Sequence, residues 1–201
     1  MLVVNKETNQ VLDQLPLILS LNKGGEPMGW INYERAAFYE AKDKILWRMG
    51  THEVTLRGGT NAKSGLQSTM VLDTIIAIDF DKSPTSFRKA SPTLTNKTLF
   101  SRDRHICAYC GSTFKYADLT RDHVHPLSKG GLDTWSNVVA SCRGCNQWKG
   151  DKSLAQADLK LLYVPYVPTF NEALILQNRR ILSDQMEWLI KGVSKHSRLH
   201  S

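Results

Sequence analysis

Hydrophobic and polar positions change their spacing along this chain, and the changes predict a mixed α and β fold. Residues 1–30 hold short apolar runs separated by turn residues, a pattern typical of short strands. Residues 33–49 place apolar side chains near helical spacing, with Asn32 as an N-terminal cap and Gly50 as a stop. Residues 71–80 are rich in β-branched side chains, which favours a strand.

Helical spacing dominates the second half of the chain outside one central segment. Residues 83–92 contain two prolines and several hydroxyl side chains, and they predict a linker. Residues 95–104 predict a short helix, and residues 153–163 predict a helix capped by Ser153. A longer helix is expected over residues 169–191, where apolar residues recur at helical spacing.

These elements divide the chain into three regions of an α+β protein. We expect an N-terminal α+β portion at 1–94, which could select a substrate, a core at 95–152 and a C-terminal helical extension at 153–201. The chain has 201 residues, of which 41% are hydrophobic, so it can bury a core and is not disordered throughout. No apolar run approaches the roughly 20 residues of a membrane span. The first ten residues also lack the apolar stretch of a signal peptide, so we expect a cytoplasmic protein with no membrane partner.

Basic residues outnumber acidic ones in this chain. Lys and Arg number 26 and Asp and Glu 19, which gives a net charge of +7 and a pI of about 9.3. Phosphates attract Lys and Arg and release their counterions on binding, so this charge is compatible with a nucleic-acid partner. Many basic proteins bind no nucleic acid, and the charge alone therefore does not choose a function.

Four cysteines form two C-x-x-C pairs, Cys107 with Cys110 and Cys142 with Cys145. An intracellular location argues against disulfides, and two such pairs can supply the four thiolates of a closed structural zinc site. The alternatives are four unrelated buried cysteines or a redox pair. A closed site leaves no open coordination position, so this zinc is expected to stabilise the fold and not to catalyse.

The segment between the cysteine pairs carries the side chains of a candidate catalytic site. Residues 119–124 and 137–141 predict two strands, and residues 143–149 predict the start of a helix, which together form a β-β-α unit. His123 has a ring that can accept a proton from water. Asp122 and Asn146 offer the oxygen ligands that Mg²⁺ or Mn²⁺ prefers.

Further polar side chains lie near this candidate site. Lys149 follows Asn146 by three residues, hence on nearly the same helix face, and can meet a phosphate. Arg121 and Arg143 can line a phosphate track or form solvated surface charge. His125 projects to the same strand face as His123 and either assists the metal or substrate, or serves packing or a hydrogen bond.

These residues resemble the motif of the HNH endonucleases, the ββα-metal or His-Me finger nucleases. The match comprises the Asp122-His123 dipeptide, Asn137, Asn146 and the following Lys149, with a C-x-x-C pair on each side, over about residues 98–152. The resemblance implies a zinc-stapled, treble-clef-like nuclease core in a protein of bacterial or phage type. It also implies that His123 is the general base, that Asp122 and Asn146 hold the catalytic cation, and that Asn137 orients the loop carrying the base.

Two functions from different classes are compatible with this motif. The first is a metal-dependent HNH endonuclease that hydrolyses DNA phosphodiester bonds, with structural zinc and catalytic Mg²⁺ or Mn²⁺. The second is a zinc-knuckle module that binds nucleic acid without cleaving it. The intact set of Asp122, His123 and Asn146 favours the nuclease, because a pure binder needs no base beside a hard-metal ligand. Sequence or modification specificity, nicking against double-strand cleavage, biological role and oligomeric state do not follow from the sequence.

Overall fold

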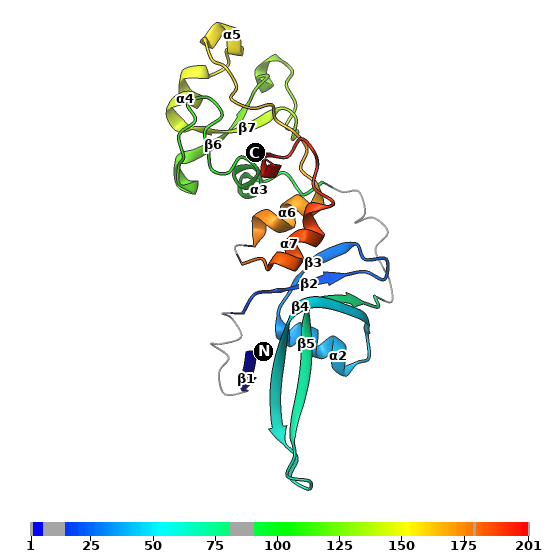
Figure 1. Cartoon of the computed structure of the whole chain (residues 1–201). Helices are drawn as coiled ribbons and strands as arrows, with labels where there is room; N and C mark the ends of the chain where they lie inside the picture. Colours follow the sequence, from blue (N-terminus) through cyan, green and yellow to red (C-terminus); the bar gives the residue numbers. More distant parts are fainter. Residues whose placement is uncertain (1, 6–14, 81–90, 179, 201) are drawn as a thin grey trace. The chain divides into compact units, whose positions relative to one another are not determined.

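The computed structural model describes residues 2–5, 15–80, 91–178 and 180–200 (Figure 1). It has the mixed α and β composition that the sequence predicts. The chain forms two compact units, and neither is a continuous stretch. Unit 1 comprises Met1–Lys89 and Asn178–Lys191, and unit 2 comprises Ala90–Gln177 and Gly192–Ser201. Among the described helices, none combines the length and apolar character needed to cross a membrane.

Unit 1 is built on a five-stranded sheet with the order β1-β4-β5-β2-β3. The strands are β1 (Leu2–Asn5), β2 (Ile18–Leu21), β3 (Pro27–Ile31), β4 (Ile45–Thr60) and β5 (Gln67–Ile78). Strands β4 and β5 pair antiparallel, whereas β2 pairs parallel with β5. Helix α2 (Tyr33–Ala41) packs Tyr33 and Ala36 into a core with Ile18, Leu72 and Ile76.

The helix predicted for residues 33–49 is shorter in the structure. Asn32 caps it as expected, because its side chain accepts a hydrogen bond from the Arg35 N–H at 2.9 Å. The helix ends at Ala41, and Asp43 takes a positive φ of 54°. The remaining apolar residues of this segment belong to β4, where Ile45 pairs with Ile78 of β5. Pairing with a buried neighbouring strand therefore outweighs the local helical spacing.

Unit 2 contains the central segment, and its predicted elements form nearly as expected. Helix α3 (Asn96–Arg102) precedes a two-stranded sheet, and helix α4 follows the sheet directly. The sheet and helix comprise β6 (Leu119–His123), β7 (Val138–Cys142) and α4 (Arg143–Lys149). The unit also has the 3-10 turns η2 (Tyr116–Asp118), η3 (Leu127–Lys129) and η4 (Arg198–His200).

The C-terminal helical region differs most from its prediction. Ser153 does cap a helix, but α5 (Leu154–Ala157) ends at Asp158, which has a left-handed backbone. The long helix predicted for residues 169–191 is two helices, α6 (Phe170–Gln177) and α7 (Ser183–Ile190). They belong to different units, so the segment predicted as one extension at 153–201 is divided between unit 1 and unit 2.

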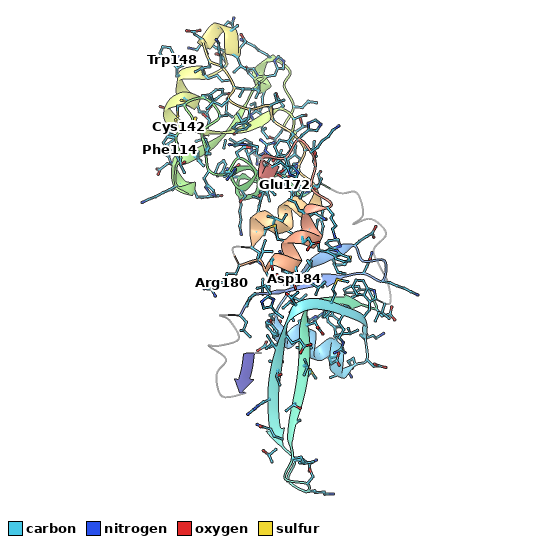
Figure 2. The ribbon with its side chains drawn as sticks, viewed as in Figure 1. Phe114, Cys142, Trp148, Glu172, Arg180 and Asp184 are labelled. Atoms are coloured by element: carbon cyan, nitrogen blue, oxygen red, sulfur yellow. The ribbon has the colours of Figure 1, made fainter. Side chains whose placement is uncertain are left out.

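Side chains on α7 attach it to the sheet of unit 1. Asp184, which is labelled in Figure 2, accepts a hydrogen bond from the Thr51 N–H at 2.8 Å. Gln185 is fully buried, and its Nε2 donates to the carbonyl oxygens of Leu17 and Thr74, both at 2.8 Å. The amide therefore satisfies the carbonyl group just before β2 and a carbonyl group within β5.

We predict that Gln185→Leu lowers the stability of unit 1 while leaving unit 2 intact. The apolar side chain leaves two buried carbonyl oxygens without their donor, at a cost of about 1–3 kcal/mol each. Urea unfolding should show a loss of at least about 2 kcal/mol, and hydrogen exchange in β2 and β5 should report it for unit 1. Glu187→Gln, an exposed change on the same helix, is the control. Equal protection in both variants would contradict the anchoring role.

Candidate active site and metal centre

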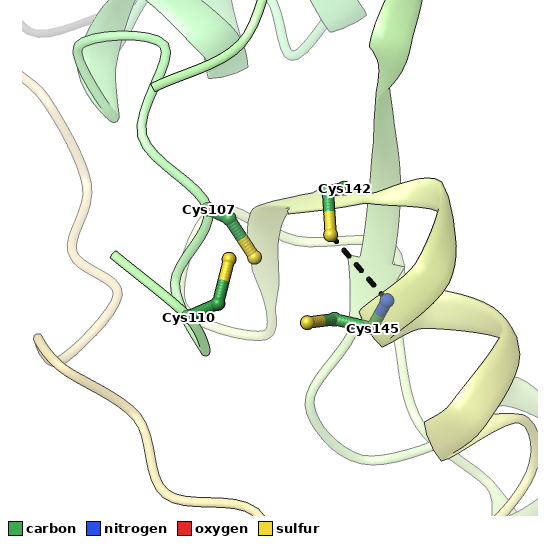
Figure 3. Close-up of side chains that lie close together, drawn as sticks. All are labelled: Cys107, Cys110, Cys142 and Cys145. Atoms are coloured by element: carbon green, nitrogen blue, oxygen red, sulfur yellow. Dashed lines mark hydrogen bonds between the residues drawn. The ribbon is translucent and has the colours of Figure 1, made fainter. Parts of the chain in front are cut away.

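The four cysteines converge at one point in unit 2 (Figure 3). Their sulfur atoms all lie within 4.8 Å of one another. Zinc bonds to sulfur at about 2.3 Å, which places tetrahedral sulfurs about 3.8 Å apart, so the cluster fits this ion. Cys142 is the N-cap of α4, and its Sγ accepts a hydrogen bond from the Cys145 N–H at 3.4 Å. Gly111, with a φ of 75°, makes the turn after the first pair.

The surroundings of Cys107 favour the thiolate that a metal needs. Burial alone raises the pKa of its thiol. Hydrogen bonds from backbone N–H groups, including those of Cys110 and Cys142, outweigh burial and lower the pKa to about 7. The opposite holds for Cys145, whose pKa is raised by burial and by hydrogen bonding to Cys142. Zinc binds the deprotonated form of cysteine, so metal binding releases the protons that remain on the cluster.

An open pocket of about 370 Å³ lies beside the strand β6 and the helix α4. It brings together three residues predicted as catalytic, Asp122, His123 and Asn146. Its full lining is Arg121, Asp122, His123, Pro126, Leu127, Ser128, Asn146, Lys149, Gly150 and Asp151. The pocket is therefore lined by the end of the strand β6 and by one face of the helix α4.

Asp122 is 5% exposed and has a hydrogen-bond partner on each carboxylate oxygen. Its Oδ1 accepts from the Lys149 Nζ at 3.0 Å, and its Oδ2 accepts from the Tyr109 hydroxyl. Burial and the bond to Asp122 raise the pKa of Tyr109, so this hydroxyl remains a donor. A carboxylate has about four lone-pair sites, so Asp122 retains acceptor capacity toward the pocket.

The position of Lys149 differs from the phosphate contact that the sequence predicts. Its side chain is fully buried, and its ammonium also donates to the His123 carbonyl oxygen at 2.7 Å. A buried ammonium without its carboxylate partner is costly, which holds Lys149 against Asp122. Lys149 does line the pocket on the same side of α4 as Asn146. Its ammonium, however, bonds to Asp122 and His123 of β6 and is not exposed to solvent.

His123 lies in a hydrogen-bonded chain that includes Asp133, a residue outside the sequence motif. The His123 Nε2 is 2.9 Å from the Asp133 Oδ1, and Arg121 donates to both oxygens of Asp133 at 2.9 and 2.7 Å. Burial raises the pKa of Asp133, but hydrogen bonds from His123 and Arg121 outweigh it and lower this pKa below its ordinary value. An ionised carboxylate only accepts hydrogen bonds, so Nε2 carries the proton and Nδ1 is the acceptor nitrogen of the neutral ring.

Asn137 fastens the loop that follows β6. Its Oδ1 accepts from the His125 N–H at 2.9 Å, and its Nδ2 donates to the carbonyl oxygens of His125 and Leu132 at 3.0 and 2.8 Å. The same loop approaches Gly131 so closely that a Cβ there would lie 1.9 Å from the His125 carbonyl oxygen. The His125 ring forms a bond within this loop, because its Nε2 lies 2.9 Å from the Lys129 carbonyl oxygen.

The remaining predicted residues lie on or near α4. The Asn146 Nδ2 donates a hydrogen bond to the Thr120 Oγ1 at 2.8 Å. Because this bond uses the nitrogen of the amide, the amide oxygen is the group that can bind a ligand. Together with Asp122, this gives the hard oxygen donors that fit a divalent cation. Arg143 lies on the same helix and donates to the Ala117 carbonyl oxygen at 2.9 Å.

Three residues of this site carry no signal in the sequence that identifies them. Asp133 lies ten residues beyond His123, and only the fold of the intervening loop brings them together. Tyr109 lies inside the first cysteine pair, where its contact with Asp122 has no spacing rule. Asp151 lines the pocket and follows Gly150 at the end of α4. In the sequence, an acidic residue at this place is typical of solvent-exposed charge after a helix.

A match with a known protein family lies within this unit. The family model of HNH endonucleases matches residues 107–162, which confirms the resemblance that the motif indicates for this segment. Over 50 residues the chain is 42% identical to the CRISPR-associated endonuclease Cas9 of Corynebacterium diphtheriae. That alignment covers 24% of this chain and 5% of the relative. Residues 107–162 are therefore similar to HNH endonucleases, and the chain spans only a small part of the length of the relative that it matches.

We predict that the purified protein contains one zinc ion bound by the four thiolates. Cys142→Ser should lose the metal and unfold unit 2, because the binding energy of a structural metal is also folding energy. Elemental analysis and hydrogen exchange in β6 and β7 measure both effects. Ser136→Ala, an exposed change in the same unit, is the control. Protein purified without chelator and free of zinc would refute the site.

Proposed function

We propose that this protein is a metal-dependent endonuclease of the HNH type that hydrolyses DNA phosphodiester bonds. The observation that carries the proposal is the convergence of His123, Asp122 and Asn146 on one open pocket. The match of residues 107–162 to HNH endonucleases supports it independently. The order of the strand pair and the helix α4, with the four cysteines clustered beside them, supports the proposal of a zinc-stapled ββα-metal core.

Asp122 and Asn146 are the residues that would hold a divalent cation, Mg²⁺ or Mn²⁺. Such an ion supplies charge stabilisation for the phosphate and for the leaving oxygen when it is bound. The Lys149 ammonium beside Asp122 offsets part of the carboxylate charge. This pairing favours a weakly held ion that completes its coordination with water and phosphate oxygens, as Mg²⁺ does in phosphoryl-transfer sites.

His123 accepts a proton from the attacking water in this proposal. Its Nε2 proton is directed at Asp133, so the Nδ1 lone pair is the basic site. Asp133 thereby fixes both the tautomer and the ring plane, and it stabilises the imidazolium that forms when the water loses its proton. Asn137 contributes by holding the backbone of the loop that begins directly after His123.

Basic residues around the pocket would position the DNA backbone. Arg121 lines the pocket, and Arg143 lies on the helix α4 that borders it. The net charge of +7 favours association with phosphates over the whole surface. Lys149 is left out of this contact set, because its ammonium is buried against Asp122. His125 has a bond to Lys129 within its loop, which favours a structural role over substrate binding.

We predict that the protein cuts supercoiled plasmid with Mg²⁺ or Mn²⁺ and that EDTA stops the reaction. His123→Ala should lower the single-turnover rate by at least about a hundredfold, since general bases contribute about 10² to 10⁴ in rate. Zinc content and DNA affinity should stay unchanged. Asp122→Asn, which keeps an acceptor for the buried Lys149, should bind DNA and fail to cleave it.

His125→Ala is the matched histidine control for this experiment and should retain cleavage. If only His125→Ala is inactive, the second histidine is the base. If the wild-type protein binds DNA and never cuts it with either metal, the non-catalytic zinc-knuckle module is the correct function.

We predict that Asp133→Ala slows the chemical step by at least about tenfold, because an unheld imidazole samples the wrong tautomer and orientation. Asp133→Glu should recover part of the rate, since it restores an acceptor. Loss of the negative charge of Asp133 favours DNA binding and by itself would raise the activity. Loss of the hydrogen bond that orients the His123 ring would lower it. Asp118→Ala makes the same charge change at an exposed site and serves as the control. Equal rates for Asp133→Ala and Asp118→Ala would exclude the positioning role.

A further inference from the structure

The hairpin of β4 and β5 extends well beyond the core of unit 1 (Figure 1). Val54 and Leu72 are the last directly opposed pair in which both side chains are buried. Past them, every residue from 57 to 69 is exposed except the half-buried Gly58. We call residues 57–69 the distal ribbon. At about 3.3 Å per residue, its strand arms, residues 57–60 and 67–69, are about 13 and 10 Å long.

Polar side chains hold the distal ribbon in one shape. The Ser68 hydroxyl donates to the Gly59 carbonyl oxygen at 2.9 Å, and the Gln67 Nε2 donates to the Gly58 carbonyl oxygen at 3.2 Å. At the tip, the Asn61 side chain accepts hydrogen bonds from the N–H groups of Lys63 and Ser64 at 2.9 and 3.1 Å. An element with this many internal bonds is preorganised, so little conformational entropy is lost when it binds.

The charge on the distal ribbon differs from that at its base. Residues 54–72 contain Arg57 and Lys63 and no acidic residue. Glu53 and Asp73 lie opposite each other immediately below this stretch. Most of the other side chains of the distal ribbon are hydroxyls or amides, which both donate and accept hydrogen bonds. At the tip, Leu66 is 72% exposed and adds one large apolar side chain to this polar surface.

We propose that the distal ribbon binds in the major groove of duplex DNA, an inference that rests on the DNA nuclease function proposed above. The major groove is about 12 Å wide and 8.5 Å deep, and it admits a two-stranded antiparallel ribbon. Arg57 and Lys63 contact phosphates at the groove walls. The hydroxyl and amide side chains between them meet base edges, and Leu66 contacts apolar groups such as the thymine methyl.

Charge complementarity selects DNA over a protein partner for this ribbon. A protein strand that pairs with the distal ribbon needs main-chain hydrogen bonds and no excess of positive charge. A stretch without a single acidic residue, by contrast, presents no group that repels a phosphate backbone. The distal ribbon thus gives unit 1 a role in selecting the substrate.

The test compares wild type with the double variant Arg57→Ala/Lys63→Ala on a duplex oligonucleotide without added Mg²⁺ or Mn²⁺, with affinity measured across a salt series. Each lost phosphate contact lowers the slope of log K against log salt by about 0.9 and weakens binding by about fivefold near 0.15 M salt. The double variant should therefore lose nearly 2 from the slope and bind about 25-fold more weakly. Lys42→Ala, an exposed lysine of unit 1 outside the ribbon, should change neither quantity appreciably.

A second duplex carries glucosylated hydroxymethylcytosine, whose sugar fills the major groove. It should weaken wild-type binding much more than binding by the double variant. Equal affinities and slopes for the double variant and wild type, with cleavage by wild type intact, would overturn the ribbon proposal alone. Equal wild-type affinity for both duplexes would overturn the assignment to the major groove. A wild-type protein that neither binds nor cuts duplex DNA would overturn the nuclease function as well.

Discussion

The cluster of four thiols is the constraint on which unit 2 depends. Cys142 ends the strand β7 and caps the helix α4, so the cluster fixes where that helix starts. From this start, the rise of 1.5 Å per residue sets the height of Asn146 on the helix. Asn146 then bonds to Thr120 on β6, whose partner strand ends at the cluster. The position of the four sulfur atoms therefore determines where the strand pair and α4 lie, and through them the geometry of the pocket.

A second dependency concerns the charges around the pocket. The carboxylate of Asp122 accepts hydrogen bonds from both the Tyr109 hydroxyl and the Lys149 ammonium, so the three side chains form one buried cluster. The ammonium also holds the His123 backbone through its carbonyl oxygen. The orientation of the histidine thus has two supports, one through Asp133 at the ring and one through Lys149 at the main chain. Positioning by two independent contacts is typical of sites that must hold a geometry closely.

The sequence predicts the centre of unit 2 well, because its spacing rules are short. Two C-x-x-C pairs, a strand ending at His123 and a helix starting after Cys142 all depend on neighbours along the chain. The prediction fails where distant pairing decides: Ile45 joins a strand because β5 lies beside it, and α7 separates from α6 to join another unit. Asp133 and the burial of Lys149 belong to the same class, since both depend on a folded loop or a facing strand.

The path of the chain between the two units determines which fragments of the protein contain a complete unit. The chain leaves unit 1 near residue 90, returns for residues 178–191 and leaves again for the last ten. A single cut therefore cannot yield either unit whole, and a fragment that stops before α7 lacks the buried amide that completes the sheet. A fragment limited to residues 107–162 would in turn lack the helices α3 and α6 and the last ten residues of unit 2.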